Sequence, residues 1–194
     1  MRILIAGIAG GIVMFIWSAV AHMVLPIGEV GFRQMPNEAA VIAPLKNNIN
    51  ESGIYMVPGM DMQNATEAEQ AAWAEKYKAG PRAFVIFHPM GAEPMGPGML
   101  LTELASNIFA SLCGALILSW LICTFLGRVA AAGLIGLAAW LSIVVSMWNW
   151  YGFPGNYTLA QGVEQTVGWL LAGLAIAWLL ERRGTAVPAL SPQP

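Results

Sequence analysis

Charged residues are scarce in this chain: Asp, Glu, Lys and Arg make up 10% of its 194 residues, against about 25% in ordinary soluble domains. A soluble domain with so few charges would have to expose large apolar patches, which soluble monomers avoid. The net charge of −2 provides no basic surface, so nucleic acid is not expected as a partner. The low charge content therefore predicts a membrane protein.

Cysteine is also scarce. The chain has two, Cys113 and Cys123, and both fall within one apolar stretch. The long polar segment at residues 26–98 contains none, so no disulfide framework supports it. Whatever structure this segment has must come from its own packing or from a partner.

Long apolar stretches are present four times. A bilayer core about 30 Å thick takes roughly 20 helical residues to cross, and each stretch is that long. The predicted fold is an all-α membrane bundle of four transmembrane helices running up and down, with a small α/β extracytoplasmic domain between helices 1 and 2. Residues 1–25 form helix 1, 26–98 the outer domain, 99–181 helices 2–4, and 182–194 a disordered cytoplasmic tail. The apolar stretches are Ile3–Leu25, Met99–Leu126, Val129–Trp150 and Thr158–Leu180.

Basic residues orient the chain in the membrane. Arg2 precedes the first stretch, Arg128 lies between the second and third, and Arg182 and Arg183 follow the fourth, whereas the loop at 151–157 has no Lys or Arg. Because positive charge near span ends marks the cytoplasmic side, both termini are predicted to be cytoplasmic. The chain is then expected in a bacterial inner membrane, with residues 26–98 in the periplasm. A cleavable signal peptide is the alternative for the first stretch, but its apolar run is too long for a normal signal.

The outer segment contains patterns of secondary structure. Residues 52–58 and 82–88 are apolar, β-favouring runs, hence strands. Thr66 and Glu69 have the spacing of a capping box and predict a helix between the strands; an earlier helix is expected from Asn37. The strand–helix–strand order is long enough for a crossover, which predicts a two-stranded sheet covered by a helix. Two strands are marginal alone, so this domain is expected to lean on the bundle or on a partner.

Small residues four apart mark three predicted helices. Such pairs let helix backbones approach closely where lipid provides no hydrophobic drive to associate. They predict helix–helix contacts, although Gly and Ala are also simply common in membrane helices. The pairs are Gly7 with Gly11, Ala110 with Gly114, and Gly173 with Ala177.

Polar residues lie in the outer halves of all four predicted spans, at spacings of three or four, so each helix presents one polar face. Together they predict a polar pocket that could share a proton, coordinate a metal, or bind a lipid head group or quinone. The alternative is that these polar side chains are hydrated near the membrane surface, or that they form hydrogen bonds between helices that hold the bundle together. The inner halves are nearly uncharged, which argues against a channel or proton pump. The candidate binding residues are His22, Glu103, Asn107, Asn149, Gln161, Glu164 and Gln165.

Methionine is concentrated in and around the outer segment. Met60 and Met62, with His88 and Met90, bring thioethers and an imidazole into sequence neighbourhoods that suit Cu(I). The alternative is that these methionines fill irregular gaps in a small core or an adaptable interface.

Three motifs of the outer segment resemble a family of small, uncharacterised four-span proteins of the bacterial inner membrane. They are Pro36-Asn37-Glu38, the run from Gly53 to Gly59, and the segment from Gly80-Pro81 to His88-Pro89. The resemblance implies the four-span architecture and supplies no known activity.

Two functional hypotheses follow. The first is a non-catalytic accessory or assembly subunit of a larger envelope complex, because the sequence contains no catalytic motif and has helix faces suited to packing. The second is a small membrane enzyme or ligand-binding protein that uses the outer polar pocket for a lipid, quinone or metal. The expected partners are membrane lipids and either a protein subunit or further copies of the chain; the sequence identifies no cofactor.

Overall fold

The computed structural model describes residues 1–181 and divides into two compact units. The helical unit comprises Met1–Phe32 and the chain from Met95 onward, and the ribbon unit is Arg33–Pro94. Part of the segment predicted as the outer domain, residues 26–32 and 95–98, therefore belongs to the helical unit. The predicted disordered tail at 182–194 lies outside the described residues.

The helical unit contains four helical segments long and apolar enough to cross a membrane, as the sequence predicts. By the length and composition of these helices the chain is a multi-pass membrane protein. The segments are α1 (Arg2–Met23), α4 (Pro97–Trp120), the continuous run Phe125–Tyr151, and α7 (Gly155–Glu181). The continuous run consists of α5 (Phe125–Ala139), η1 (Trp140–Val144) and α6 (Val145–Tyr151).

The boundary between the second and third spans differs from the prediction. The sequence analysis extends the second span to Leu126, but α4 ends at Trp120 and α5 already begins at Phe125. Thr124 is the reason: its side-chain oxygen accepts a hydrogen bond from the Gly127 backbone N–H at 3.1 Å and caps the new helix. An unbroken apolar run hides such a boundary, because a single capping threonine does not interrupt hydropathy.

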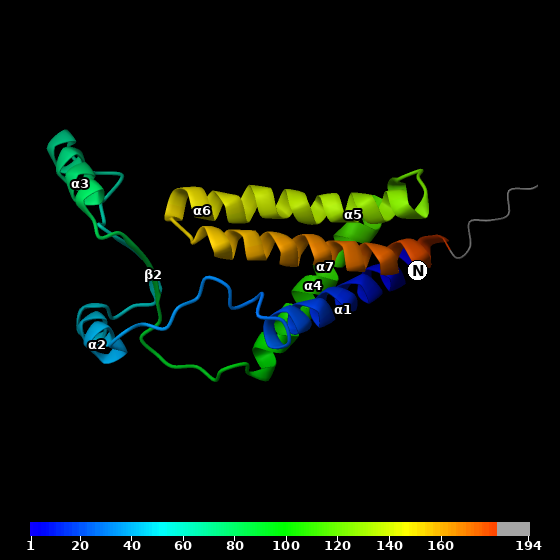
Figure 1. The fold of residues 1–194 in the computed structure, drawn as a ribbon, viewed down its shortest axis with the longest axis horizontal. Helices are drawn as coiled ribbons and strands as arrows, with labels where there is room; N and C mark the ends of the chain where they lie inside the picture. Colours follow the sequence, from blue (N-terminus) through cyan, green and yellow to red (C-terminus); the bar gives the residue numbers. More distant parts are fainter. Residues whose placement is uncertain (182–194) are drawn as a thin grey trace, which may run out of the picture. The chain divides into compact units, whose positions relative to one another are not determined.

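The helices pack in the order α4, α1, α7, α5, with α7 between α1 and α5 (Figure 1). The predicted small pair on α1 lies in a helix contact, since a Cβ on Gly11 would overlap the backbone of Ile108 in α4. On α7, a Cβ on Gly173 would meet that of Ala132 in α5 at 2.5 Å. Glycine at these two positions is what lets the backbones approach.

One residue of the small pair on α4 lies in a helix contact and the other does not. Ala110 is exposed, whereas Gly114 is buried. A Cβ on Gly114 would meet the ring of Trp169 from α7 at 2.5 Å, and one on Gly136 of α5 would also touch that ring. Two glycines on different helices therefore make room for one bulky indole.

The core of the helical unit lies towards the C-terminal end of α4. Leu118 and Ile176 are fully buried, and Ile3 and Leu180 pack against this cluster. The start of α1 and the ends of α4 and α7 thus meet in one apolar region. Burial of these apolar side chains helps to hold the three helices together.

The third span contains a π-helical turn, η1, that the sequence analysis does not anticipate. The indole N–H of Trp140 donates to the Thr158 backbone carbonyl of α7 at 2.7 Å. A Cβ on Gly162, one turn further along α7, would meet the same ring at 2.8 Å. The hydrogen bond and the missing side chain together seat Trp140 against α7.

The ribbon unit contains two strands, β1 (Gly53–Val57) and β2 (Ala83–Phe87), as predicted. They pair antiparallel, from Gly53 opposite Phe87 to Val57 opposite Ala83. The expected crossover, which would make the strands parallel, is therefore wrong. The intervening chain leaves β1 and enters β2 at the same end of the ribbon, so it forms a long hairpin connection.

In sequence, one helix precedes the ribbon and another lies between its two strands. The capping box of α3 (Glu67–Ala79) is confirmed: the Thr66 side chain accepts from the Glu69 N–H at 3.3 Å, and Glu69 accepts from the Thr66 N–H at 2.8 Å. The earlier helix, α2, spans Glu38–Asn48. α3 does not cover the ribbon face that carries Ile54 and Ile86, whose exposed fractions are 64% and 61%.

Candidate functional site

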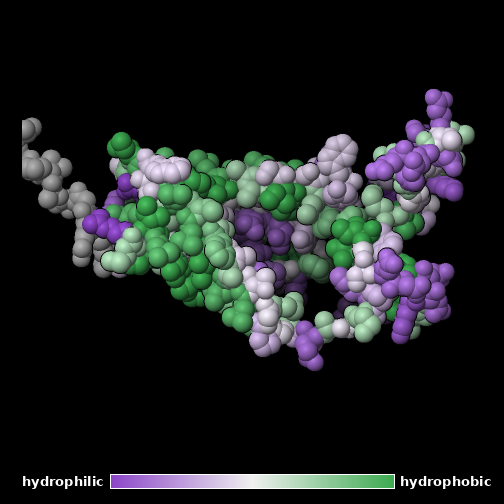
Figure 2. All heavy atoms as spheres, turned by 180° about the vertical axis from the view of Figure 1, so that it is seen from behind, coloured by the Kyte–Doolittle hydropathy of each residue, from purple (hydrophilic) through white to green (hydrophobic). Residues whose placement is uncertain are grey.

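Three helices of the helical unit line a polar groove. Figure 2 shows a hydrophilic patch interrupting the hydrophobic surface of this unit. A cavity of about 60 Å³ lies where α1, α4 and α7 face one another. The lining residues, which define the polar groove below, are Met14, Trp17, Ser18, Glu103, Asn107, Glu164, Gln165 and Gly168.

Glu164 is the polar centre of the groove. It is 8% exposed, and its carboxylate has polar neighbours on two helices. Oε1 lies 3.1 Å from Nε2 of His22 and accepts from the Ser18 hydroxyl at 3.5 Å, both on α1. Oε2 accepts from the Gln161 amide at 3.3 Å. A buried carboxylate needs such donors, and here they connect α1 to α7.

The chain after α1 holds His22 in place. The Gly28 backbone N–H donates to the Ala21 carbonyl at 3.2 Å, which folds the segment back on the helix end. A Cβ on Gly28 would overlap the His22 imidazole, so glycine lets the backbone lie against the ring. Further along, Phe32 meets Tyr157 of α7 edge to face with ring centroids 5.8 Å apart. The side chain of His22 nevertheless remains 48% exposed.

Trp17 closes one side of the groove and was not predicted. Its indole N–H donates to the Glu164 backbone carbonyl at 3.0 Å. A Cβ on Gly168, four residues after that carbonyl, would meet the Trp17 ring at 3.1 Å. This is the arrangement that Trp140 adopts with Thr158 and Gly162. A glycine four residues after a polar position is the sequence signal that could have suggested a seated ring.

Glu103 differs from Glu164 in both exposure and partners. It is exposed on α4, and its Oε1 accepts from the Asn107 amide of the same helix at 2.9 Å. Among the described residues, no donor from a second helix reaches its carboxylate. Glu103 is the seventh residue of α4, about 9 Å along the axis from Pro97 at 1.5 Å per residue.

The other predicted binding residues divide into two groups. Gln165 lines the groove beside Glu164, and Gln161 reaches it through its hydrogen bond to the carboxylate. Asn149 lies exposed on α6 and is absent from the lining. Gln161, Glu164 and Gln165 share one face of α7, and all three lie at the groove. The polar face predicted for the third span does not line the groove, because Asn149 is absent from it.

The predicted copper ligands are not brought together. In the antiparallel register, His88 and Met90 follow the Gly53–Phe87 end of the ribbon, and Met60 and Met62 follow the Val57–Ala83 end. Four residue steps of strand separate these ends by about 13 Å. His88 instead contacts the Ser52 hydroxyl at 3.2 Å. Met62 and Met90 are 78% and 81% exposed.

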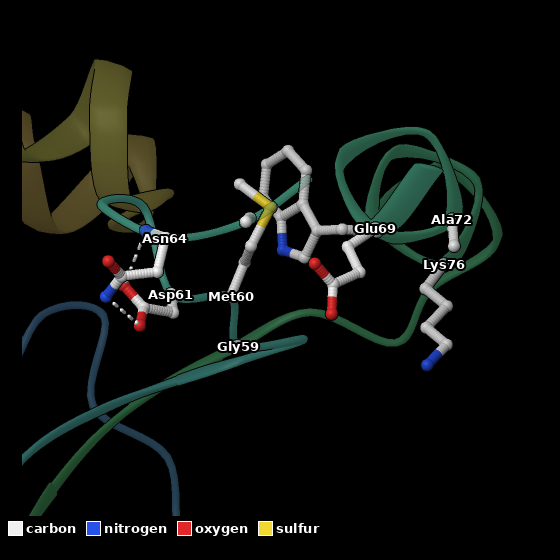
Figure 3. Close-up of a pocket in the computed structure, with 9 residues that line it drawn as sticks. Gly59, Met60, Asp61, Asn64, Glu69, Ala72 and Lys76 are labelled. Atoms are coloured by element: carbon white, nitrogen blue, oxygen red, sulfur yellow. Dashed lines mark hydrogen bonds between the residues drawn. The ribbon is translucent and has the colours of Figure 1, made fainter. Parts of the chain in front are cut away.

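A second cavity, of about 380 Å³, lies in the ribbon unit. Figure 3 shows Met60 of the loop after β1 near Glu69 of α3, Asp61 and Asn64 hydrogen-bonded to each other, and Lys76 extending away from the loop; all five line this cavity. Hydrogen bonds from the Asn64 side chain and the Gln63 backbone lower the pKa of Asp61. The backbone N–H and hydroxyl of Thr66 likewise lower the pKa of Glu69. Both carboxylates thus serve the local turn and helix start.

Within residues 1–181, no cluster of three or more His, Cys, Asp or Glu side chains has the geometry to hold a metal ion. Comparisons with known protein families, curated proteins and solved structures found no match to this chain. The groove itself therefore carries the functional argument. Chemically it offers one nearly buried carboxylate, Glu164, with partners on two helices, and one exposed carboxylate, Glu103, with a partner on its own helix.

Proposed function

We propose that this chain is a non-catalytic accessory or assembly subunit of a larger complex in a bacterial inner membrane. The observation that carries the proposal is the exposed carboxylate of Glu103 on a helix long and apolar enough to span a membrane. An ionisable side chain at the bilayer centre costs about 2.5–3.5 kcal/mol, and the cost falls towards the interface. A partner that covers Glu103 and supplies a donor would remove that cost.

The proposed topology is up and down, with both termini cytoplasmic and the ribbon unit periplasmic. The meeting of Ile3, Leu118 and Leu180 in one core supports it, because the start of α1 then lies beside the ends of α4 and α7. Arg128 supports the same end as cytoplasmic: its guanidinium lies 3.9 Å from Glu181 at the end of α7. The groove then belongs to the periplasmic half of the membrane.

The ribbon unit also favours a partner. A two-stranded ribbon is marginal on its own, and the face with Ile54 and Ile86 is largely exposed. Neither strand carries a charged residue at its edge, a feature that normally protects exposed strands from pairing with other chains. Docking on a larger assembly would stabilise this unit.

The size of the groove disfavours the alternative hypothesis, a binding site for a lipid or quinone. Its cavity of about 60 Å³ has room for a few water molecules. Small-molecule sites typically enclose roughly 300–1,000 Å³. Moreover, the donors around Glu164 already satisfy that carboxylate, which leaves it little capacity to hold a ligand.

Purification of the full-length protein from membranes of its native host tests the proposal. We expect a large particle with stoichiometric partner subunits after mild-detergent affinity capture, size-exclusion chromatography and mass spectrometry. A small particle that contains this chain alone, at native abundance and in two different mild detergents, would contradict a role as a complex subunit.

A further inference from the structure

The two carboxylates of the polar groove have unequal surroundings. Glu164 is 8% exposed and has His22, Ser18 and Gln161 as polar neighbours. Glu103 is exposed and has the amide of Asn107 on its own helix. The first carboxylate is satisfied inside the helical unit; the second has free acceptor capacity on the outside, since a carboxylate offers about four lone-pair sites.

The arrangement of the helices opens the groove sideways. The backbones of α4 and α7 both lie close to α1 along much of their length but approach each other at few positions, chiefly where Trp169 of α7 lies against Gly114. α1 therefore forms the floor through Met14, Trp17 and Ser18, while α4 and α7 form the two walls. A helix laid along this opening would contact both walls. The hydrophilic patch seen in Figure 2 interrupts the apolar surface of this unit.

We propose that the polar groove receives a transmembrane helix of a partner subunit, and that a Lys or Arg side chain of that helix pairs with Glu103. This inference rests on the proposed function as an accessory subunit. Charge complementarity supports a basic occupant. His22, the cation-forming side chain at the groove, is already engaged with Glu164, so Glu103 has no positive partner among the described residues.

The membrane-spanning helices of a second copy of this chain do not supply the required charge. Within the four described spans, the basic residues other than His22 are Arg2 and Arg128. Arg2 begins α1 and Arg128 lies beyond the end of α4, so both lie at the end of the unit remote from Glu103. The complementarity thus points to a different polypeptide rather than to a homo-oligomer.

The proposal is tested with the full-length protein in phosphatidylcholine–phosphatidylglycerol vesicles. The probe is a 24-residue Leu/Ala transmembrane peptide with one Lys seven residues from each end, which places a Lys at the level of Glu103 in either orientation. The control peptide has Leu at both positions. Energy transfer between dyes on a terminal tag of the protein and on the peptide measures association.

We expect the Lys peptide to associate roughly five- to tenfold more tightly than the Leu peptide, a size typical of a strong polar contact between membrane helices. Glu103→Gln should abolish most of this preference. Glu29→Gln, which removes a carboxylate from the exposed loop after α1, should retain it. Glu103→Lys should instead prefer a peptide with Glu at the same positions.

Equal association of the two peptides with the unchanged protein would overturn the inference, and so would a Lys preference that persists in Glu103→Gln. Thermal unfolding of each variant in detergent verifies that the fold survives. Failure of this inference is distinguishable from failure of the proposed function. If a native complex is found but its partner helices carry no Lys or Arg near Glu103, the proposed basic partner helix is wrong, whereas the role as a complex subunit stands.

Discussion

His22 and Glu164 lie 142 residues apart in the chain, yet Nε2 of the imidazole is 3.1 Å from Oε1 of the carboxylate. The contact ties the end of α1 to the first half of α7. Because the carboxylate is nearly buried while the imidazole is half exposed, the two partners are not equivalent. Glu164 depends on its donors, whereas His22 can also be hydrated.

Because Glu164 is the nearly buried acceptor of this contact, the two substitutions Glu164→Leu and Glu164→Gln are predicted to destabilise the protein to different extents. Glu164→Leu should lower the free energy of unfolding by about 1–3 kcal/mol, because Ser18, His22 and Gln161 lose their shared acceptor in a poorly hydrated site. Glu164→Gln, which keeps an acceptor oxygen, should cost less. Denaturation of the full-length protein in mixed detergent micelles measures both. A larger loss for Gln than for Leu would contradict the assignment of Glu164 as an acceptor.

Gly11 is predicted to be intolerant of a side chain. The Cβ of Gly11→Ala would overlap the backbone of Ile108, which cannot rotate away, so α1 and α4 must separate. We expect a loss of about 1–3 kcal/mol in the free energy of unfolding. Gly98→Ala on α4 is the matched control, since a Cβ there meets open space. Equal stability of the two variants would contradict the close α1–α4 contact.

The two indole hydrogen bonds to α7 are predicted to be comparable. Trp17→Phe and Trp140→Phe each keep an aromatic ring but remove the donor to the Glu164 or Thr158 carbonyl. Each should lower the free energy of unfolding by about 0.5–1.5 kcal/mol, the usual net value of one hydrogen bond. Trp120→Phe at an exposed position provides the baseline. An effect no larger than this baseline would show that the indole bonds do not hold α7.

The start of α3 is predicted to weaken in acid. Hydrogen bonds from Thr66 lower the pKa of Glu69 below 4.5, so the ionised carboxylate stabilises the folded helix. This contribution is fully present above the ordinary pKa and is lost as the pH falls through the lowered one. Amide exchange of the 66–79 segment, corrected for its intrinsic pH dependence, should accelerate across that interval. In Glu69→Gln the acceleration should disappear, whereas Glu67→Gln should retain it.

Copper binding by the four predicted ligands together is not expected. Met60 and His88 follow opposite ends of the ribbon, so one Cu(I) ion cannot contact both without rearrangement of the register. Titration of the full-length protein with Cu(I) under reducing conditions should show no site that both Met60→Ala and His88→Ala abolish. Loss of the same stoichiometric site in both variants would contradict the antiparallel register.

Hydropathy was sufficient to predict the four membrane-crossing helices, because length and apolar composition are local properties of the chain. The capping box at Thr66 and Glu69 was equally readable, since a helix start is decided within four residues. The same local reasoning missed the helix start at Phe125 within an apolar run. It also assumed a crossover where the chain turns back as a hairpin, because strand direction depends on contacts distant in sequence.

The sequence by itself determined which residues could form a polar site, since i,i+3 and i,i+4 spacing fixes what shares a helix face. Only the tertiary structure decided which of those faces meet. It brought Ser18 and His22 to Glu164, left Asn149 apart, and placed Glu103 in the groove but exposed, with a partner on its own helix. The physical reason is close packing at glycines: Gly11, Gly168 and Gly173 set which helices approach, and the spacing of polar residues along one helix carries no information about its neighbours.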